Sequence, residues 1–445
     1  MGSHHAMGFV SCVAHIAESE CLGSLMFEGV EFDGYVASMS YVPSPEIVAD
    51  GVRIEAVSAS DYSANQSKAL CILEYSPNQK LAIAKWVSPK RTRSYPFARL
   101  YRIYHFGCKR VAIIPLIKDE GVGESRNKSN NDRINFTTLS WMNLMNIYVV
   151  LAWYDNAEKK SSTRITSQAL NEEHIRKQLD RIAAYQFDAH HWNQNHFRDD
   201  FIPVLDNAVS SYRRIAADLE VSMHDFDDHI KFRDRVVDLD SPSNDKLSLE
   251  RFEQHSVPRS RAAAKRETTT IHADEDLDEN SEKAVFNIRN NLGGIYPITT
   301  DEVFIDEESK TVVIRESKNS TKDGLPSEDD IYDGLFKLLL FKHIQLLSKD
   351  GVQYTLEPQL RLTGILNGPL RLPEQNAQLE AFISSNAFTR GEIKLLRRAL
   401  AEAKCNSISV LLEPNDLSRP IPRPSPQKRL SLNLRGFLRG KREPS

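Results

Sequence analysis

The sequence predicts a mixed α/β fold, in which short apolar strands alternate with helices of regular apolar spacing. Two apolar runs, at 111–117 and 147–153, flank a helical pattern at 132–146. This order is typical of a strand–helix–strand unit with a parallel strand pair. Further along, residues 296–305 and 311–318 have the composition of two strands joined by a polar turn. We therefore expect mixed sheets flanked by helices.

Composition limits the class of protein. The chain has 445 residues, of which 40% are hydrophobic and 27% charged, with a formal net charge of −4. These values are ordinary for a globular chain of two or three domains, and any nucleic-acid-binding surface would have to be a local basic patch. No apolar run approaches the length of a membrane span, and we find no secretory segment. The five cysteines include no C-x-x-C pair, which favours a reducing cytoplasm and gives no support to a zinc site.

Changes in composition divide the chain into five segments. Residues 1–7 resemble the remnant of an expression tag. Residues 8–236 form an expected N-terminal α/β domain with a helical extension from about residue 163. Residues 237–280 are polar and charged in alternating blocks, as in a linker. Residues 281–413 are expected to form a second α/β domain, and 414–445 a basic, proline-rich tail.

The strand pair in the second domain carries the most informative side chains. Its second strand begins with apolar residues such as Val312 and ends with Glu316 and Lys318 on the same face, because strand side chains repeat every two residues. The first strand carries Asp301 and Glu302. Charges beside a core are costly unless they are paired or bound to metal. Two carboxylates and a lysine would form a pocket suited to Mg²⁺ and to a water attacking a phosphodiester.

The Glu-x-Lys tripeptide is common in this chain, so its position in the sequence is more informative than its residues. The pattern occurs five times, beginning at Glu158, Glu308, Glu316, Glu392 and Glu402. Only the copy at Glu316 ends a β-branched apolar run and follows an acid-bearing strand. Ser327 is then the expected N-cap of a helix over 328–347. Its apolar stripe would contain Ile331, Leu335, Leu338, Leu339 and Leu346.

This order of strand, strand and helix resembles the PD-(D/E)XK nuclease superfamily, best known from type II restriction endonucleases. The resemblance implies a restriction-endonuclease-like core in residues 281–413 that uses Mg²⁺ to hydrolyse DNA phosphodiester bonds. It implies Asp301 and Glu316 as metal ligands and, together with Lys318, as the catalytic residues. Thr300 stands where the pattern has proline, so Glu302 remains a rival for the first acid.

The resemblance also implies partners. They are double-stranded DNA and a second copy of the chain, since cutting both strands of a palindrome asks for two symmetry-related sites. RNA stays open as a substrate, and Glu282 is a possible additional acid. The expected setting is a bacterial cytoplasm without membrane association. The alternative is a non-catalytic nucleic-acid-binding or regulatory protein with a degenerate nuclease fold.

A basic stretch over 85–110 supports either function. It interleaves cations with aromatic residues and contains no acid. Guanidinium and ammonium groups neutralise phosphates, which provides sequence-independent affinity, although such a run also occurs on ordinary solvated helices. The expected DNA contacts are Lys85, Lys90, Arg91, Arg93, Arg99 and Arg102, which would make residues 8–236 a DNA-binding domain.

Two other groups of polar residues are rival sites. Asp119, Glu120 and Asp132 follow the apolar run at 111–117, at the sheet edge where open α/β sheets bind ligands. Loop solvation and helix capping explain them more simply, and no glycine-rich phosphate loop accompanies them. His190, His191 and His196 lie close together in sequence. They lack the spacing of a known metal motif, which favours packing or capping roles.

Overall fold

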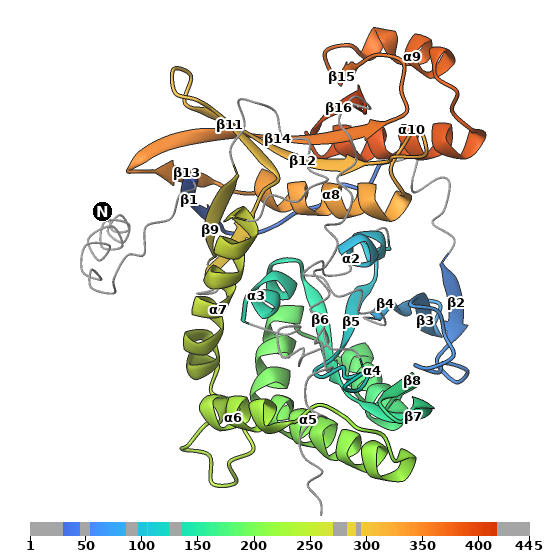
Figure 1. Ribbon diagram of the computed structural model, residues 1–445, viewed down its shortest axis with the longest axis vertical. Coiled ribbons are helices and arrows are strands. Elements are labelled where there is room, and N and C mark those ends of the chain that lie inside the picture. Colours follow the sequence, from blue (N-terminus) through green and yellow to red (C-terminus); the bar gives the residue numbers. More distant parts are fainter. Residues whose placement is uncertain are drawn as a thin grey trace, which may run out of the picture.

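The computed structural model describes residues 30–44, 54–85, 97–104, 106–123, 136–269, 283–290 and 295–415. Within these ranges the strands form a nine-stranded mixed sheet, a five-stranded mixed sheet and a two-stranded hairpin, with helices packed against them (Figure 1). The predicted mixed α/β class is therefore confirmed. None of the described helices is long and apolar enough to cross a membrane.

The five-stranded sheet comes from the N-terminal part of the chain. Its order is β2 (Glu55–Ser58), β3 (Leu70–Ser76), β4 (Gln79–Lys85), β5 (Lys109–Pro115) and β6 (Ile147–Ala152). Helix α3 (Phe136–Leu144) connects β5 to β6, and these two strands are parallel, as predicted. Every residue of β6 is buried. The apolar composition of that strand follows from this burial.

Helices cover this sheet and continue away from it. They are α4 (Glu172–Ala184), α5 (Ala189–Leu219), α6 (Asp227–Val236) and α7 (Leu249–Thr269). Helix α7 lies within the segment 237–280 that we expected to be a linker. Two strands that we did not predict, β7 (Tyr154–Ser161) and β8 (Arg164–Leu170), form an antiparallel hairpin before α4. Most of the exposed β7 side chains are polar, so no apolar run indicates this strand.

The nine-stranded sheet positions the candidate site. Its path is β10, β9, β1, β13, β14, β12, β11, with β16 beside β14 and β15 beside β16. The strands are β1 (Val30–Val36), β9 (Ala284–Asn290), β10 (Ile295–Thr299), β11 (Glu302–Asp306), β12 (Thr311–Asn319), β13 (Leu346–Lys349), β14 (Val352–Gly364), β15 (Leu370–Leu372) and β16 (Ser409–Pro414). Strand β1, far away in sequence, pairs with β9 and β13.

The strand predicted over 296–305 is divided into two. Its first part, β10, pairs with β9, and its second part, β11, pairs with β12. These partners lie at opposite ends of the sheet path, yet only Thr300 and Asp301 separate β10 from β11. Three residues span at most about 11 Å, so the sheet curls until its two ends approach each other. Asp301 lies at this junction.

Helix α8 (Glu328–Lys342) packs on β12 and β14 (Figure 1). Ser327 is its N-cap, as predicted, and its hydroxyl oxygen accepts a hydrogen bond from the Asp330 N–H at 3.2 Å. Four of the predicted stripe residues are buried. The predicted end of the helix at 347 is wrong, because α8 ends at Lys342 and the exposed Leu346 begins β13. The buried stripe residues are Ile331, Leu335, Leu338 and Leu339.

The remaining helices surround this layer. Helix α2 (Phe97–Ile103) packs against α8 and connects the two large sheets. Its Tyr101 ring stacks on the Tyr332 ring of α8, with 5.3 Å between the ring centroids. At the C-terminal end lie the short helix η2 (Asn376–Gln378), α9 (Leu379–Ser385) and α10 (Arg390–Cys405). Helix α10 contacts both α8 and β16. Helix α8 is thus held by the sheet and by two helices.

Candidate active site

Asp301 is placed against the end of β12 by the pairing of β11 with β12. In this antiparallel register Glu302 lies opposite Arg315, so Asp301, one residue earlier, lies at the level of Glu316. The Asp301 carboxylate accepts a hydrogen bond from the Ser317 N–H, with 3.0 Å between Asp301 Oδ2 and Ser317 N. The acid before β11 is therefore anchored between the two residues of the Glu-x-Lys motif.

Glu316 and Lys318 lie on the same face of β12, as the alternation predicts. That face begins with the fully buried Val312 and Ile314 and packs beneath α8. Glu316 is only 3% exposed. Lys318 Nζ donates a hydrogen bond to Glu316 Oε1 at 3.0 Å. The structure thus brings Asp301, Glu316 and Lys318 together at one end of the strand pair.

Helix α8 adds two charged residues to this group. Lys337 Nζ lies 2.7 Å from Glu316 Oε2, and Asp333 Oδ2 lies 3.4 Å from Lys318 Nζ. Asp333 and Lys337 are four residues apart and therefore point to the same side of the helix. Neither residue was predicted from the sequence. The available signal was that these two charged residues interrupt the otherwise apolar run 331–341 of the helix.

Gly334 lets the helix approach this closely. A Cβ atom at this position would lie 2.9 Å from Leu360 Cδ1 and 3.1 Å from Lys318 Cε. Glycine in a helix interior is unfavourable by roughly 1 kcal/mol relative to alanine, so its presence between Asp333 and Leu335 has a packing reason. The space of the missing side chain is occupied by the Lys318 stem and by Leu360 of β14.

The close packing of these charged groups shifts the pKa values of the three carboxyl groups. Burial, together with the charge of Glu316, raises the pKa of Asp301 to about 6. Burial also acts to raise the pKa of Glu316, but Lys337 and Lys318 outweigh it, and the pKa of Glu316 lies below its ordinary value. The pKa of Asp333 is raised, chiefly by burial. The three carboxyl groups are therefore unequal: the pKa is lowered at the buried Glu316 and raised at Asp301 and Asp333.

The two lysines keep their protons in spite of burial. Desolvation works to lower the pKa of Lys318, yet Glu316, Asp333 and Asp301 raise it above its ordinary value. Desolvation likewise works to lower the pKa of Lys337. The negative charges of Glu316 and, to a smaller extent, Asp301 outweigh it, so the pKa of Lys337 is raised. Charges that have been taken from water require such compensation. The group as a whole holds three carboxylates against two ammonium groups.

Glu302, the rival first acid, belongs to a different group. It is 1% exposed, and its carboxylate lies 3.2 Å from Arg315 Nη1 and 3.5 Å from Arg361 Nη1. Arg315 and Glu316 are neighbours on β12, so they point to opposite faces of the sheet. The geometry therefore associates Asp301 with Glu316 and Lys318, and Glu302 with two arginines.

The donor set determines which metals fit. Among the described residues, no three or more His, Cys, Asp and Glu side chains form a group that could hold a metal ion unaided. Asp301 and Glu316 offer carboxylate oxygens only, and Oε2 of the buried Glu316 has a cation, the Lys337 ammonium group, beside it at 2.7 Å. Mg²⁺ is commonly held by one or two carboxylates together with water and substrate phosphate oxygens. The residues thus fit Mg²⁺ and do not fit zinc.

Of the six expected DNA contacts, the structure describes the side chains of Lys85 and Arg102. Lys85 is buried at the end of β4, and its ammonium group donates to the backbone carbonyls of Ala64, at 2.8 Å, and Ser67, so it does not present its charge on the surface. Arg102 of α2 forms ion pairs with Glu328 at 3.2 Å and Asp329 at 2.9 Å, at the start of α8. Outside the described residues lie Lys90, Arg91, Arg93, Glu282 and the side chain of Arg99.

The carboxylate of Asp119 organises a loop. Its Oδ1 accepts hydrogen bonds from the Gly121 N–H and from His224 Nδ1, both at 2.8 Å, and its Oδ2 accepts one from the His224 N–H at 3.1 Å. Glu120 pairs with Lys118 at 3.1 Å. Asp132 lies outside the described residues. Asp119 is 3% exposed, so this arrangement suits loop and chain closure rather than ligand binding.

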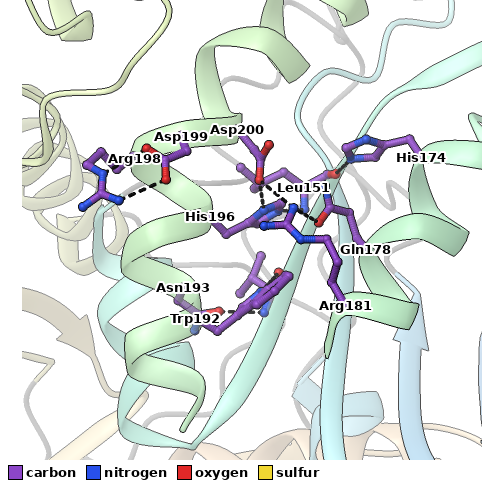
Figure 2. A network of polar contacts seen from close by, with 11 residues as sticks. Leu151, His174, Gln178, Arg181, Trp192, Asn193, His196, Arg198, Asp199 and Asp200 are labelled. Carbon is purple, nitrogen blue, oxygen red and sulfur yellow. Dashed lines mark hydrogen bonds and ion pairs between the residues drawn. The ribbon is translucent and has the colours of Figure 1, made fainter. Parts of the chain in front are cut away.

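The histidine-rich start of α5 covers the outer edge of β6 (Figure 2). Asn193 accepts a hydrogen bond from the Val149 N–H at 2.8 Å and donates to the Ile147 carbonyl at 2.9 Å. His196 Nε2 accepts from the Leu151 N–H at 3.0 Å. These side chains replace the neighbouring strand that β6 lacks, which satisfies backbone groups that would otherwise be buried without partners.

The second ring nitrogen of His196 is also engaged. Its Nδ1 lies 2.7 Å from Asp200 Oδ2 on the next turn of α5 (Figure 2). Because Nε2 accepts the hydrogen bond from the Leu151 N–H, the ring N–H is on Nδ1, which donates a hydrogen bond to Asp200. Both nitrogens are therefore used within the fold. This supports the packing role for His196 over a metal-binding role.

Comparison with known proteins adds no assignment: no family model, no curated protein and no solved structure matches the chain.

Proposed function

We propose that this protein is a Mg²⁺-dependent endonuclease that hydrolyses DNA phosphodiester bonds. The observation that carries the proposal is the convergence of Asp301, Glu316 and Lys318, through the Ser317 N–H bond to Asp301 and the 3.0 Å contact between Glu316 and Lys318. Buried groups of this kind, with shifted pKa values, concentrate at functional sites. The order of strand, strand and helix around them, with β14 parallel to β12, agrees with the resemblance to PD-(D/E)XK nucleases.

Each residue has a distinct role in this proposal. Asp301 and Glu316 would hold the Mg²⁺ ion, and this ion would supply a water of lowered pKa and positive charge for the phosphate oxygens. Lys318 would orient the attacking water and stabilise the charge that develops on the phosphate. Its ammonium group is held for that role by Glu316 and Asp333. No histidine base is required.

The finer proposal is sequence-specific cleavage of double-stranded DNA by a homodimer, as in type II restriction endonucleases. A dimer would place two such sites on the two strands of a palindrome. Digestion of unmethylated phage DNA with Mg²⁺, followed by sequencing of the fragment ends, tests this part. A single repeated end sequence supports the proposal, and random ends contradict it.

The chemical part is tested by plasmid cleavage with and without Mg²⁺. We expect Glu316→Ala and Lys318→Ala to reduce cleavage by at least ~100-fold, the usual cost of losing a charge-stabilising group. The matched control is Glu308→Ala, which alters the exposed Glu-x-Lys copy in the turn between β11 and β12. If the two site variants cleave as fast as the control, the proposal is wrong. Salt-dependent DNA binding without cleavage under any divalent cation would instead indicate the non-catalytic alternative.

A further inference from the structure

Lys337 holds an unusual position among the charges of this site. Glu316 uses its two carboxylate oxygens for two different lysines, Oε1 for Lys318 and Oε2 for Lys337. Lys318 belongs to the same strand, makes a hydrogen bond with proper geometry and has Asp333 as a second acid. Among the described residues, Lys337 has its one ion pair with Glu316, with 2.7 Å between Nζ and Oε2.

The ammonium group of Lys337 lies directly at an oxygen of a proposed metal ligand. Its Nζ is 2.7 Å from Glu316 Oε2, whereas Lys318 is paired with the other oxygen of the same carboxylate. A divalent cation that used Glu316 Oε2 would compete directly with this ammonium group, because two cations at one carboxylate oxygen repel each other strongly in a poorly solvated site.

We propose that Lys337 is an internal counter-ion that occupies the cation position at Glu316 Oε2, and that a metal ion must displace it. Resting on the proposed function, this inference makes Lys337 a positioning residue that acts through Glu316. It compensates the charge of Glu316 in the metal-free protein and lowers the affinity of the site for metal. The helical attachment of Lys337 allows the displacement, since its long side chain can leave without any change in the strands.

The test measures Mn²⁺ binding to the full chain in the absence of nucleic acid, by the electron paramagnetic resonance signal of free Mn²⁺. We expect Lys337→Gln and Lys337→Met to bind Mn²⁺ about tenfold more tightly than the parent, since metal no longer displaces a charge. Lys337→Arg, which keeps the charge, should stay within about twofold of the parent. The control Lys342→Met alters an exposed lysine of the same helix and should leave the affinity unchanged.

Thermal unfolding provides a second readout. Without Lys337, three carboxylates face a single ammonium group, so Lys337→Gln should melt at a lower temperature than the parent in metal-free buffer. Mn²⁺ should then raise its melting temperature by more than it raises that of the parent. A lysine with only a structural role would produce the lower melting temperature without the larger response to Mn²⁺, and that result would overturn the proposal.

A further variant separates this inference from the proposed function. If Glu316→Ala binds Mn²⁺ as the parent does, the metal site itself is misplaced and both proposals fail. If Glu316→Ala loses Mn²⁺ binding while Lys337→Gln and Lys337→Met keep the parent affinity, the metal site stands and only the role of Lys337 is wrong. Tighter binding in both Lys337 variants, with weaker or absent binding in Glu316→Ala, supports both.

Discussion

The Asp301 carboxylate accepts a hydrogen bond from the backbone N–H of Ser317, the central residue of the Glu-x-Lys motif, at 3.0 Å. This contact joins the start of β11 to the end of β12 through a backbone group, so it is independent of the Ser317 side chain. It aligns Asp301 with Glu316, whereas the next residue, Glu302, interacts with arginines. The distinction between two adjacent acids leads to the first prediction.

Asp301→Asn and Glu302→Gln should have opposite effects. In Asp301→Asn the amide oxygen can still accept from Ser317, but the metal ligand is weakened, so we expect cleavage to fall at least ~100-fold with little change in stability. Glu302→Gln removes the acid shared by Arg315 and Arg361, and removal of one member of a buried ion group costs about 3 kcal/mol. Urea unfolding and plasmid cleavage, measured together, check this. The reverse pattern would identify Glu302 as the metal ligand.

Gly334→Ala should displace α8 from the site. The added Cβ would lie 2.9 Å from Leu360 Cδ1 and 3.1 Å from Lys318 Cε. Overpacking of this kind costs about 1–3 kcal/mol, and the better helix propensity of alanine returns about 1 kcal/mol. We therefore expect a modest loss in the free energy of unfolding but a larger loss in cleavage rate, since Lys318 must shift. Urea unfolding and plasmid cleavage measure the two effects.

The matched control for that variant is Gly391→Ala in α10, where the nearest atom to an added Cβ would be Thr389 Oγ1 at 3.8 Å. It should be neutral or slightly stabilising, with unchanged cleavage. Equal effects of the two substitutions would show that Gly334 has no role in helix placement at the site.

Asn193→Ala should destabilise the N-terminal sheet. The Asn193 side chain is fully buried and forms hydrogen bonds with the Val149 N–H and the Ile147 carbonyl of β6. An unsatisfied buried backbone group costs about 1–3 kcal/mol, so we expect a loss of about 3 kcal/mol in urea unfolding. The exposed neighbour Gln194→Ala should change stability by less than about 0.5 kcal/mol. Comparable losses in both variants would show that the β6 edge does not depend on α5.

Stability should fall in mild acid because of His229. Burial lowers its pKa from 6.5 to about 4 in the folded chain, against the opposing charges of Asp119 and Asp228. Between these pH values the unfolded chain binds the proton more tightly, so this contribution to stability is complete above about pH 6.5 and is lost as the pH falls toward 4. The loss is at most about 3 kcal/mol.

The check is the pH dependence of the free energy of unfolding between pH 4 and 7. His229→Gln should flatten the curve, whatever its effect at pH 7, because a glutamine cannot take up the proton. His191→Gln, at an exposed position of α5, should keep the slope of the parent. A parent-like slope in His229→Gln would assign the acid sensitivity to other groups.

Local pattern was sufficient for the elements that build the site. The alternation from Val312 to Lys318 predicted both the strand and the common face of Glu316 and Lys318, and Ser327 predicted the start of α8. These features could be predicted because side-chain periodicity and helix capping depend only on residues a few positions apart in the sequence. The predicted helix over 328–347 was too long because the apolar composition continues into β13, and composition alone does not separate the two elements.

By itself, then, the sequence determined the mixed α/β class, the strand ending in Glu-x-Lys and the capped helix behind it. Only the tertiary structure decided which acid joins that strand, because the change of partner at Thr300 and Asp301 depends on pairing with β9 and β12. It also decided that Lys85 is buried and that Lys337 reaches Glu316. The physical reason is that periodicity determines the face of a side chain within its own element, whereas the register and packing of distant elements determine what that face meets.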